Sequence, residues 1–237
     1  MTTHPIPDPL SLWDKHVEGV LRVLCLALER LRLEGDLPLK EVDLDGRFLV
    51  TAHEAYRGLP ELDRPQMNGL QPKAEQTPIS RRDVGEKWVR TKPDFTWRMQ
   101  DNRARIPLEF TKDFHIESKR LGRQQNRKRV LTKEYVALGI IRFLSVDHRY
   151  GHDVTSGAMI GYVRDSEPSD LVDEVDGYIA ATKEYAIPPL GFPRNGSSDH
   201  AVMKARQLLN RTEVSPAEFV LHHLWVDLRV SKPGVAG

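Results

Sequence analysis

The chain has 237 residues, of which 39% are hydrophobic and 29% are charged, and its formal net charge is +1. These values are typical of a globular protein, and the near-neutral charge argues against a bulk polycation of the histone type. We expect a cytoplasmic protein with no membrane segment, because no apolar run approaches the roughly 18 residues of a membrane span, no secretory signal is seen, and one cysteine, Cys25, cannot form an internal disulfide.

The first third of the chain has the pattern of two helices followed by a long irregular segment. Residues 11–33 carry apolar side chains at helical spacing, and Gly35 follows the expected helix end. A less regular stripe predicts a second helix over residues 39–57. Residues 58–82 are rich in proline, glycine and polar residues, and a loop of this length inside a compact domain is usually functional or mobile.

The middle of the chain changes to the alternation of β-strands. In residues 93–99, aromatic and apolar side chains alternate with polar ones, which predicts a half-buried strand. Residues 106–110 and 114–121 are predicted to be further strands. In the last of these, Glu117 and Lys119 share a face, because residues two apart on a strand project to the same side.

The rest of the chain completes an α/β pattern. Further elements are predicted as a helix over residues 131–145, a strand over 157–163, a helix over 167–182, and strands over 200–209 and 219–230. This order predicts a mixed central sheet flanked by helices. We expect one domain over residues 1–237.

Two acids and one lysine stand where they can meet. If the strands are neighbours, Asp94, Glu117 and Lys119 converge on one end of the sheet. Two carboxylates form an oxygen-rich site of the kind that Mg²⁺ prefers. A lysine beside them can orient and help deprotonate a water molecule, or neutralise charge that develops on a phosphate. These groups together suffice for phosphodiester hydrolysis.

The same residues carry a resemblance to a known family. The sequences "PDF" at 93–95 and "ESK" at 117–119 resemble the PD-(D/E)xK nuclease superfamily, with its restriction-endonuclease-like fold, in motif order, spacing and predicted element order. The likeness covers roughly residues 39–165, and leaves an N-terminal helix and a C-terminal extension outside the common core. The stretches "IESKRLG", "GIIRF" and "MIGYV" look similar to short bacterial members found among restriction or phage-defence genes.

The resemblance implies Mg²⁺-dependent cleavage of DNA, with Mn²⁺ as a substitute metal. Asp94 and Glu117 would be the metal ligands, and Lys119 would lie at the attacking water. Members of the superfamily often supply another acid from the helix before the first strand. Glu41 and Glu54 are the candidates here, and Glu41 is preferred.

Two features depart from the pattern or compete with it. A RecB-like subgroup has a glutamine four residues before a tyrosine, whereas Leu131 stands at that distance before Tyr135. Lys112 could replace Lys119 in principle, but it falls at an apparent turn and is three residues from Glu109, which places the two on opposite faces of a strand.

A basic run follows the predicted catalytic strand. Residues 119–133 contain no acid, so the run is either a solvated surface or a surface that tracks nucleic-acid phosphates. Beside the site, these side chains would flank the scissile phosphate. The candidate nucleic-acid-binding residues are Arg120, Arg123, Arg127, Lys128 and Arg129.

Two main hypotheses follow. The first is a metal-dependent endonuclease acting on DNA, the nuclease component of a restriction, phage-defence or repair system. The sequence has no helix-turn-helix signal, zinc finger or ATP-binding loop, so targeting would come from homo-oligomerisation or a partner subunit. The second is a non-catalytic DNA-binding or scaffolding subunit of the same fold. A purely structural explanation stands beside both: an acid and a lysine on the exposed face of a sheet edge could form a cross-strand ion pair that keeps the edge soluble. Cleavage of RNA stays open beside them.

Overall fold

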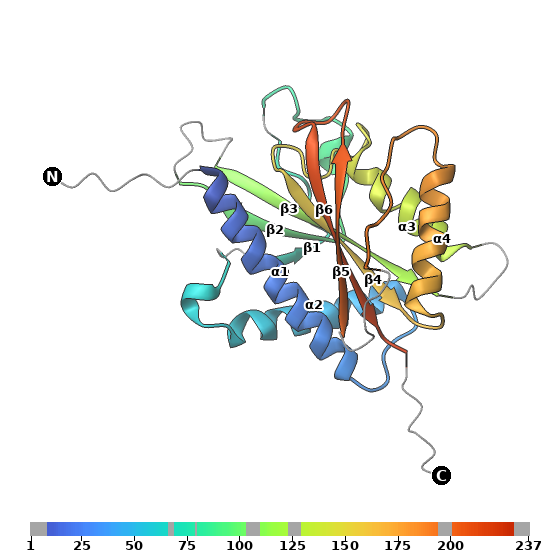
Figure 1. The fold of residues 1–237 in the computed structure, drawn as a ribbon. Helices are drawn as coiled ribbons and strands as arrows, with labels where there is room; N and C mark the ends of the chain where they lie inside the picture. The colour runs from blue at the N-terminus through green and yellow to red at the C-terminus, as the bar shows by residue number, and fades with distance from the viewer. Residues whose placement is uncertain are drawn as a thin grey trace, which may run out of the picture.

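One open, mixed β-sheet forms the centre of the protein in the computed structural model (Figure 1). The structure describes residues 9–65, 69–78, 80–102, 110–122, 129–193 and 201–229. Within these residues the sheet has six strands, and their order across it is β1-β2-β3-β4-β6-β5. The strands are β1 (Leu70–Pro72), β2 (Phe95–Gln100), β3 (Thr111–Leu121), β4 (Ser156–Val163), β5 (Val202–Asn210) and β6 (Glu218–Asp227).

The sheet is parallel at its centre and antiparallel toward both edges. Strand β3 pairs with β4, and β4 with β6, in parallel. The pairs β1–β2, β2–β3 and β5–β6 are antiparallel. Four α-helices accompany the strands in the described part of the chain, which makes this an α/β protein, as the sequence predicted. They are α1 (Pro9–Leu33), α2 (Glu41–Gly58), α3 (Leu131–Ala137) and α4 (Pro168–Ala181).

Helices α1 and α2 pack on one face of the sheet. The apolar stripe of α1 is buried, and Trp13 of this helix lies 6.2 Å from Phe114 of β3 between ring centroids. Phe48 of α2 meets Phe95 of β2 on the same face, at 5.3 Å. Burial of one amphipathic face per helix explains why the helical spacing in the sequence was a reliable signal. In the described residues no helix is both long and apolar enough to cross a membrane.

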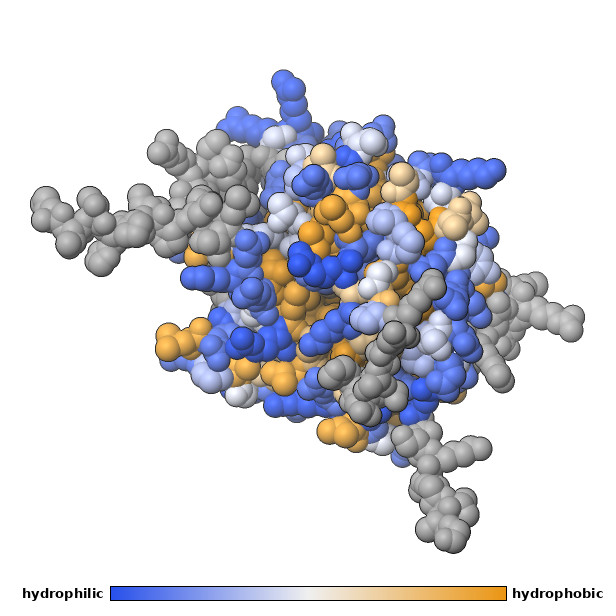
Figure 2. All heavy atoms as spheres, in the orientation of Figure 1, coloured by the Kyte–Doolittle hydropathy of each residue, from blue (hydrophilic) through white to orange (hydrophobic). Residues whose placement is uncertain are grey.

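Helix α3 lies on the other face (Figure 1). There, Tyr135 of this helix packs against Trp225 of β6. Strands β2 and β3 are buried on both faces over most of their length, and the predicted half-buried strand is wrong in this respect. Thr96 and Glu117, which were expected to face away from the core, are 1% and 0% exposed. Figure 2 shows polar and charged side chains over most of the molecular face in view, with hydrophobic side chains between them near its centre.

Gly139 divides the predicted helix over residues 131–145. A Cβ atom at Gly139 would lie 2.4 Å from Met159 Cε and 2.4 Å from the carbonyl oxygen of Tyr135, so only glycine permits this approach. Helix α3 therefore ends at Ala137, and the chain continues as the 3-10 helix η4 (Ile140–Phe143). Two shorter 3-10 helices, η1 (Glu61–Asp63) and η2 (Trp88–Arg90), lie in the stretch before β2.

Two further sequence predictions need comment. The segment predicted as irregular over residues 58–82 contains η1 and the edge strand β1. The predicted strand over residues 106–110 lies outside the described residues, except for Phe110.

Candidate active site

The structure brings Asp94, Glu117 and Lys119 together. Strands β2 and β3 pair with Phe95 opposite Ile116, so Asp94, one residue before β2, stands opposite Glu117. The Nζ atom of Lys119 lies 3.3 Å from Asp94 Oδ2 and 3.3 Å from Glu117 Oε2. All three side chains are buried. A register shift of one residue would turn the carboxylate of Asp94 to the opposite face, so this meeting depends on the pairing of the strands.

Glu41 joins these residues from the first turn of α2. Its Oε1 atom lies 3.5 Å from Lys119 Nζ, and its Oε2 atom accepts a hydrogen bond of 2.9 Å from the main-chain N–H of Arg120. The alternative acid, Glu54, is an exposed residue of the same helix. Thirteen residues at about 1.5 Å each place Glu54 roughly 20 Å further along the helix axis. Of these two acids, only Glu41 joins Asp94, Glu117 and Lys119, and we refer to these four residues, with the side chains that contact them, as the carboxylate cluster.

Asp45 is a member that the sequence analysis missed. Its Oδ1 atom is 2.7 Å from Ser118 Oγ and accepts a hydrogen bond of 3.1 Å from the hydroxyl of Tyr162. Burial is the main reason that the pKa of Asp45 is raised to about 6. The available signal was its position four residues after Glu41, which places both acids on adjacent turns of one helix face.

Ser118 links Asp45 to Asp94. Its main-chain N–H donates to Asp94 Oδ2 at 2.9 Å, and its Oγ atom lies 3.2 Å from the same oxygen. A hydroxyl has one proton to donate, so Ser118 can bind one of the two carboxylates through Oγ at a time. The main-chain bond holds Asp94 in either case.

Two more basic side chains contact the carboxylates, and neither was predicted. Lys73, which follows β1, forms an ion pair with Asp94 Oδ1. Arg142 of η4 donates from Nη1 to Glu117 Oε2 at 2.8 Å. Lys73 lies in the segment predicted as irregular, and Arg142 in the segment predicted as a continuous helix, so periodicity alone did not select them.

The two carboxylates that Lys119 joins have opposite pKa shifts. Burial would raise the pKa of Asp94, but Lys119, Lys73 and the N–H of Ser118 outweigh it and lower the pKa to about 2. Burial and the charge of Asp94 raise the pKa of Glu117 to about 8, against the opposing effects of Lys119 and Arg142. Asp94 is therefore ionised at neutral pH. Glu117 readily holds a proton at neutral pH when no metal ion is bound.

Lys119 stays protonated in this environment. Burial lowers its pKa, but the charges of Glu117, Asp94 and Glu41 more than compensate and raise the pKa above its ordinary value. The ammonium group is thus a hydrogen-bond donor and a positive charge, rather than a base. Glu117 Oε1, by contrast, is buried and accepts no hydrogen bond from the described residues.

Lys112 does not take part in the cluster. It lies within β3 rather than at the apparent turn, and its Nζ atom is 3.5 Å from Asp101 Oδ2. Seven residues of extended strand separate it from Lys119 by about 23 Å. Lys119 is therefore the lysine that shares a site with Glu117.

The predicted nucleic-acid-binding run is described only at its two ends. Arg120 donates from Nη1 to the carbonyl oxygen of Leu39. Arg129 donates from Nε to the carboxylate of Glu134 at 2.7 Å and 2.9 Å. Both guanidinium groups are thus engaged by acceptors of the protein. The predicted residues Arg123, Arg127 and Lys128 lie outside the described part of the chain.

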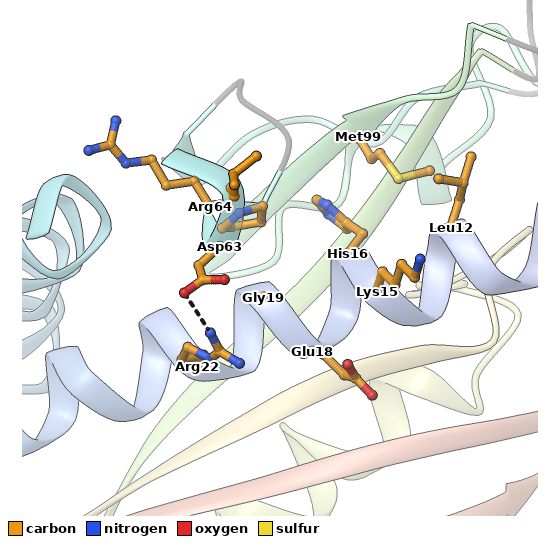
Figure 3. A pocket seen from close by; sticks show the side chains of 11 residues that line it. Leu12, Lys15, His16, Glu18, Gly19, Arg22, Asp63, Arg64 and Met99 are labelled. Atoms are coloured by element: carbon orange, nitrogen blue, oxygen red, sulfur yellow. Dashed lines mark ion pairs between the residues drawn. The ribbon is translucent and has the colours of Figure 1, made fainter. Parts of the chain in front are cut away.

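A pocket of about 300 Å³ lies elsewhere, between α1 and the segment around η1 (Figure 3). His16 points from α1 into this region, near Met99 of β2 (Figure 3). Burial lowers the pKa of His16 to about 4, so its ring is neutral at neutral pH. None of the residues that line the pocket belongs to the carboxylate cluster, so the pocket adds no chemistry to it.

The cluster holds two buried carboxylates, Asp94 directly before β2 and Glu117 on the neighbouring strand β3. Among the residues that the structure describes, no group of three or more histidine, cysteine, aspartate or glutamate side chains is arranged to hold a metal ion.

Comparison of the chain with protein-family models, curated proteins and solved structures found no match.

Proposed function

We propose that the protein is a metal-dependent endonuclease that hydrolyses phosphodiester bonds of DNA, with a restriction-endonuclease-like fold of the PD-(D/E)xK superfamily. The observation that carries this proposal is the convergence of Asp94, Glu117 and Lys119 from two neighbouring strands. The order of α2, β1, β2, β3, α3 and β4 also supports it, since it resembles the helix, three-strand meander, helix and strand of that fold. By the same resemblance, the protein serves a restriction, phage-defence or repair system, with targeting by a partner subunit or a second copy.

The residues present fit a hard divalent cation such as Mg²⁺ or Mn²⁺. Asp94 and Glu117 offer two carboxylates, and Mg²⁺ is commonly bound by one or two carboxylates with waters and a substrate phosphate in the other positions. The buried Glu117 Oε1, without a hydrogen bond from the described residues, is an oxygen that a metal would satisfy. Burial and the charge of Asp94 raise the pKa of Glu117, and a bound cation would offset the charge of Asp94 and favour the ionised form of Glu117.

Each residue of the cluster has a separate part in the proposed reaction. When bound, the metal would stabilise charge on the phosphate and lower the pKa of a coordinated water. Asp94 and Glu117 would hold it, with Asp94 fixed by the main chain of Ser118. Protonated Lys119 would donate to the attacking water or to a phosphate oxygen, where negative charge grows in the transition state. Glu41 would keep the ammonium group in place.

A second candidate function has an observation in its favour. Lys73, Lys119 and Arg142 already occupy oxygens of the two carboxylates, as expected if the acids only balance basic side chains. Such a protein would be a non-catalytic DNA-binding or scaffolding subunit of the same fold. Two points favour the catalytic alternative. Glu117 Oε1 accepts no hydrogen bond from the described residues, and Lys73 and Arg142 are more exposed than the acids they bind.

Incubation of the purified protein with plasmid DNA, linear DNA and RNA tests the proposal, in Mg²⁺, Mn²⁺ or EDTA. We expect metal-dependent cleavage of DNA by the wild type and none by Asp94→Ala or Lys119→Ala. Glu54→Gln is a matched control, because it removes an exposed acid of α2 outside the cluster. Cleavage that persists in both cluster variants would exclude this site. A wild type that binds DNA but cuts no substrate with either metal would favour the non-catalytic subunit.

A further inference from the structure

Two solvent-facing cations flank the carboxylate pair, and each is bound to a different acid. Lys73 pairs with Asp94 Oδ1, and Arg142 with Glu117 Oε2 at 2.8 Å. The side chains of Lys73 and Arg142 are 55% and 26% exposed, whereas those of Asp94 and Glu117 are 6% and 0% exposed. Both cations are thus more exposed than the acids that they bind.

The backbone positions of Lys73 and Arg142 are fixed by contacts of the main chain. The N–H of Lys73 donates to the carbonyl oxygen of Asp94 at 3.1 Å, and Lys73 has a φ of +49°, in the left-handed region that a lysine seldom adopts. Arg142 lies in η4 directly after the close packing of Gly139 on Met159, and Met159 pairs with Glu117 across β3 and β4. Each cation therefore has a fixed Cα position beside its acid and a long side chain that can turn toward another anion.

A metal and these two cations would compete for the negative charge of the same two carboxylates. Asp94 and Glu117 would hold a divalent cation, whose double charge would weaken the ion pairs that Lys73 and Arg142 make with these carboxylates. With all groups ionised, the cluster has four carboxylates and three basic side chains, a net charge of −1; a divalent cation makes it +1, and one phosphodiester brings it to zero. The groups counted are Glu41, Asp45, Asp94 and Glu117 against Lys73, Lys119 and Arg142.

We infer that Lys73 and Arg142 are exchangeable ligands: they hold the carboxylates in the metal-free protein and bind substrate phosphates beside the scissile bond once the metal has displaced them. This inference rests on the proposed function and assigns substrate contacts to two residues outside the "PDF" and "ESK" motifs. A guanidinium fits two phosphate oxygens in a fork, whereas an ammonium acts as a point charge. Arg142 therefore orients a phosphate, and Lys73 attracts one.

The exchange predicts that removal of either cation changes the affinity for metal and the affinity for DNA in opposite directions. Removing either cation takes a competitor away from the metal, so metal binding becomes tighter. The same change removes a phosphate contact, so DNA binding becomes weaker and less dependent on salt. A residue that only supports the fold of the site would weaken both, and would leave the salt dependence unchanged.

The experiment compares Lys73→Met and Arg142→Met with the wild type. Metal affinity is measured by calorimetric titration of Mn²⁺ without DNA. DNA affinity is measured by fluorescence anisotropy of a short duplex in Ca²⁺, over a series of salt concentrations. Lys92→Met is the matched control, because Lys92 is an exposed lysine near β2 that pairs with Glu75 rather than with the cluster. Lys73→Arg and Arg142→Lys retain the charge and guard against a variant that fails to fold.

We expect each methionine variant to bind Mn²⁺ about threefold or more tightly and DNA about tenfold more weakly, with a salt slope smaller by about one. The charge-retaining variants should recover most of the DNA affinity, and Lys92→Met should behave as the wild type. Weaker binding of Mn²⁺, or an unchanged salt slope, in both methionine variants overturns the inference.

Failure of the proposed function is separately visible. If the wild type cuts no DNA but the methionine variants bind Mn²⁺ more tightly and DNA more weakly, hydrolysis is refuted and the exchange stands. If the wild type cuts DNA and the methionine variants show no opposite changes, the exchange is refuted and hydrolysis stands. A wild type that binds neither Mn²⁺ nor DNA refutes both.

Discussion

Ser118 donates its main-chain N–H to the carboxylate of Asp94 at 2.9 Å. The residue between Glu117 and Lys119 on β3 thus fixes the acid that precedes the neighbouring strand. Because this bond comes from the main chain, no substitution at position 118 other than proline removes it. The spacing of the three proposed catalytic groups is consequently built into the pairing of β2 with β3.

Replacement of Ser118 by alanine should distinguish the contribution of its hydroxyl group from that of its main-chain hydrogen bond. Ser118→Ala removes the Oγ contacts with Asp45 and Asp94 but keeps the N–H bond, so we expect a loss of about 1 kcal/mol in the free energy of unfolding. Cleavage should fall far less than in Asp94→Asn, which should lose about a hundredfold or more. Denaturant unfolding and a plasmid-cleavage time course measure the two effects. Equal losses of cleavage in both variants would mean that Oγ itself takes part in the reaction.

The two acids of α2 should differ in their effect on cleavage. Glu41→Gln removes a charge 3.5 Å from Lys119 Nζ, so we expect slower cleavage, by about tenfold, at saturating metal. Glu54→Gln changes an exposed position of the same helix and should leave the rate unchanged. Single-turnover cleavage rates measure the difference. The reverse order of effects would show that the wrong acid has been assigned to the cluster.

The buried carboxyl of Glu117 should make the metal-free protein less stable as pH rises. Its pKa is about 8 in the folded protein and near the ordinary value of 4.5 when unfolded. Since the folded state holds the proton more tightly, this stabilisation is complete below pH 4.5 and is lost as pH rises through 8. Between pH 5 and pH 8, the stability of the wild type relative to Glu117→Gln should fall by up to about 1.4 kcal/mol per pH unit.

Urea unfolding of both proteins in EDTA across this range measures the difference. Comparison with Glu117→Gln cancels the pH dependence of groups that both proteins share, such as Asp45 and His16. Saturating Mg²⁺ should remove most of the slope in the wild type, because the cation favours the ionised carboxylate. A difference that does not change with pH would mean that Glu117 is ionised throughout.

A methyl group at Gly139 should disturb the end of α3 and the position of Arg142. The new Cβ would meet Met159 Cε and the carbonyl oxygen of Tyr135 at 2.4 Å, and the carbonyl cannot move aside as a side chain would. We expect Gly139→Ala to lower the free energy of unfolding by about 1–3 kcal/mol. Gly177→Ala is the control, since nothing lies within 4 Å of its Cβ in α4. That variant should be as stable as the wild type or more stable by about 0.5–1 kcal/mol.

Urea midpoints of the two alanine variants give this comparison directly. If Gly139→Ala is as stable as Gly177→Ala, the close packing of Gly139 on Met159 is not required, and the position of Arg142 has another cause.

Much of the fold followed from the sequence because its signals are local. The stripe of α1 and the alternation around Trp97 repeat within a few residues, and the periods of helix and strand are properties of the backbone itself. The face shared by Glu117 and Lys119 was predictable for the same reason. The break at Gly139 was not, because the atoms that exclude a Cβ include Met159, twenty residues further along the chain.

The sequence by itself thus determined the order of the four α-helices and of the strands β2 to β6, though not the edge strand β1. It also determined the motif residues Asp94, Glu117 and Lys119 as candidates. Only the tertiary structure decided that Asp94 stands opposite Glu117, and which further residues surround them. Those further residues are Glu41 rather than Glu54, with Asp45, Lys73 and Arg142. Strand register and helix docking set these meetings, and both depend on contacts between residues far apart in the chain, which no local period encodes.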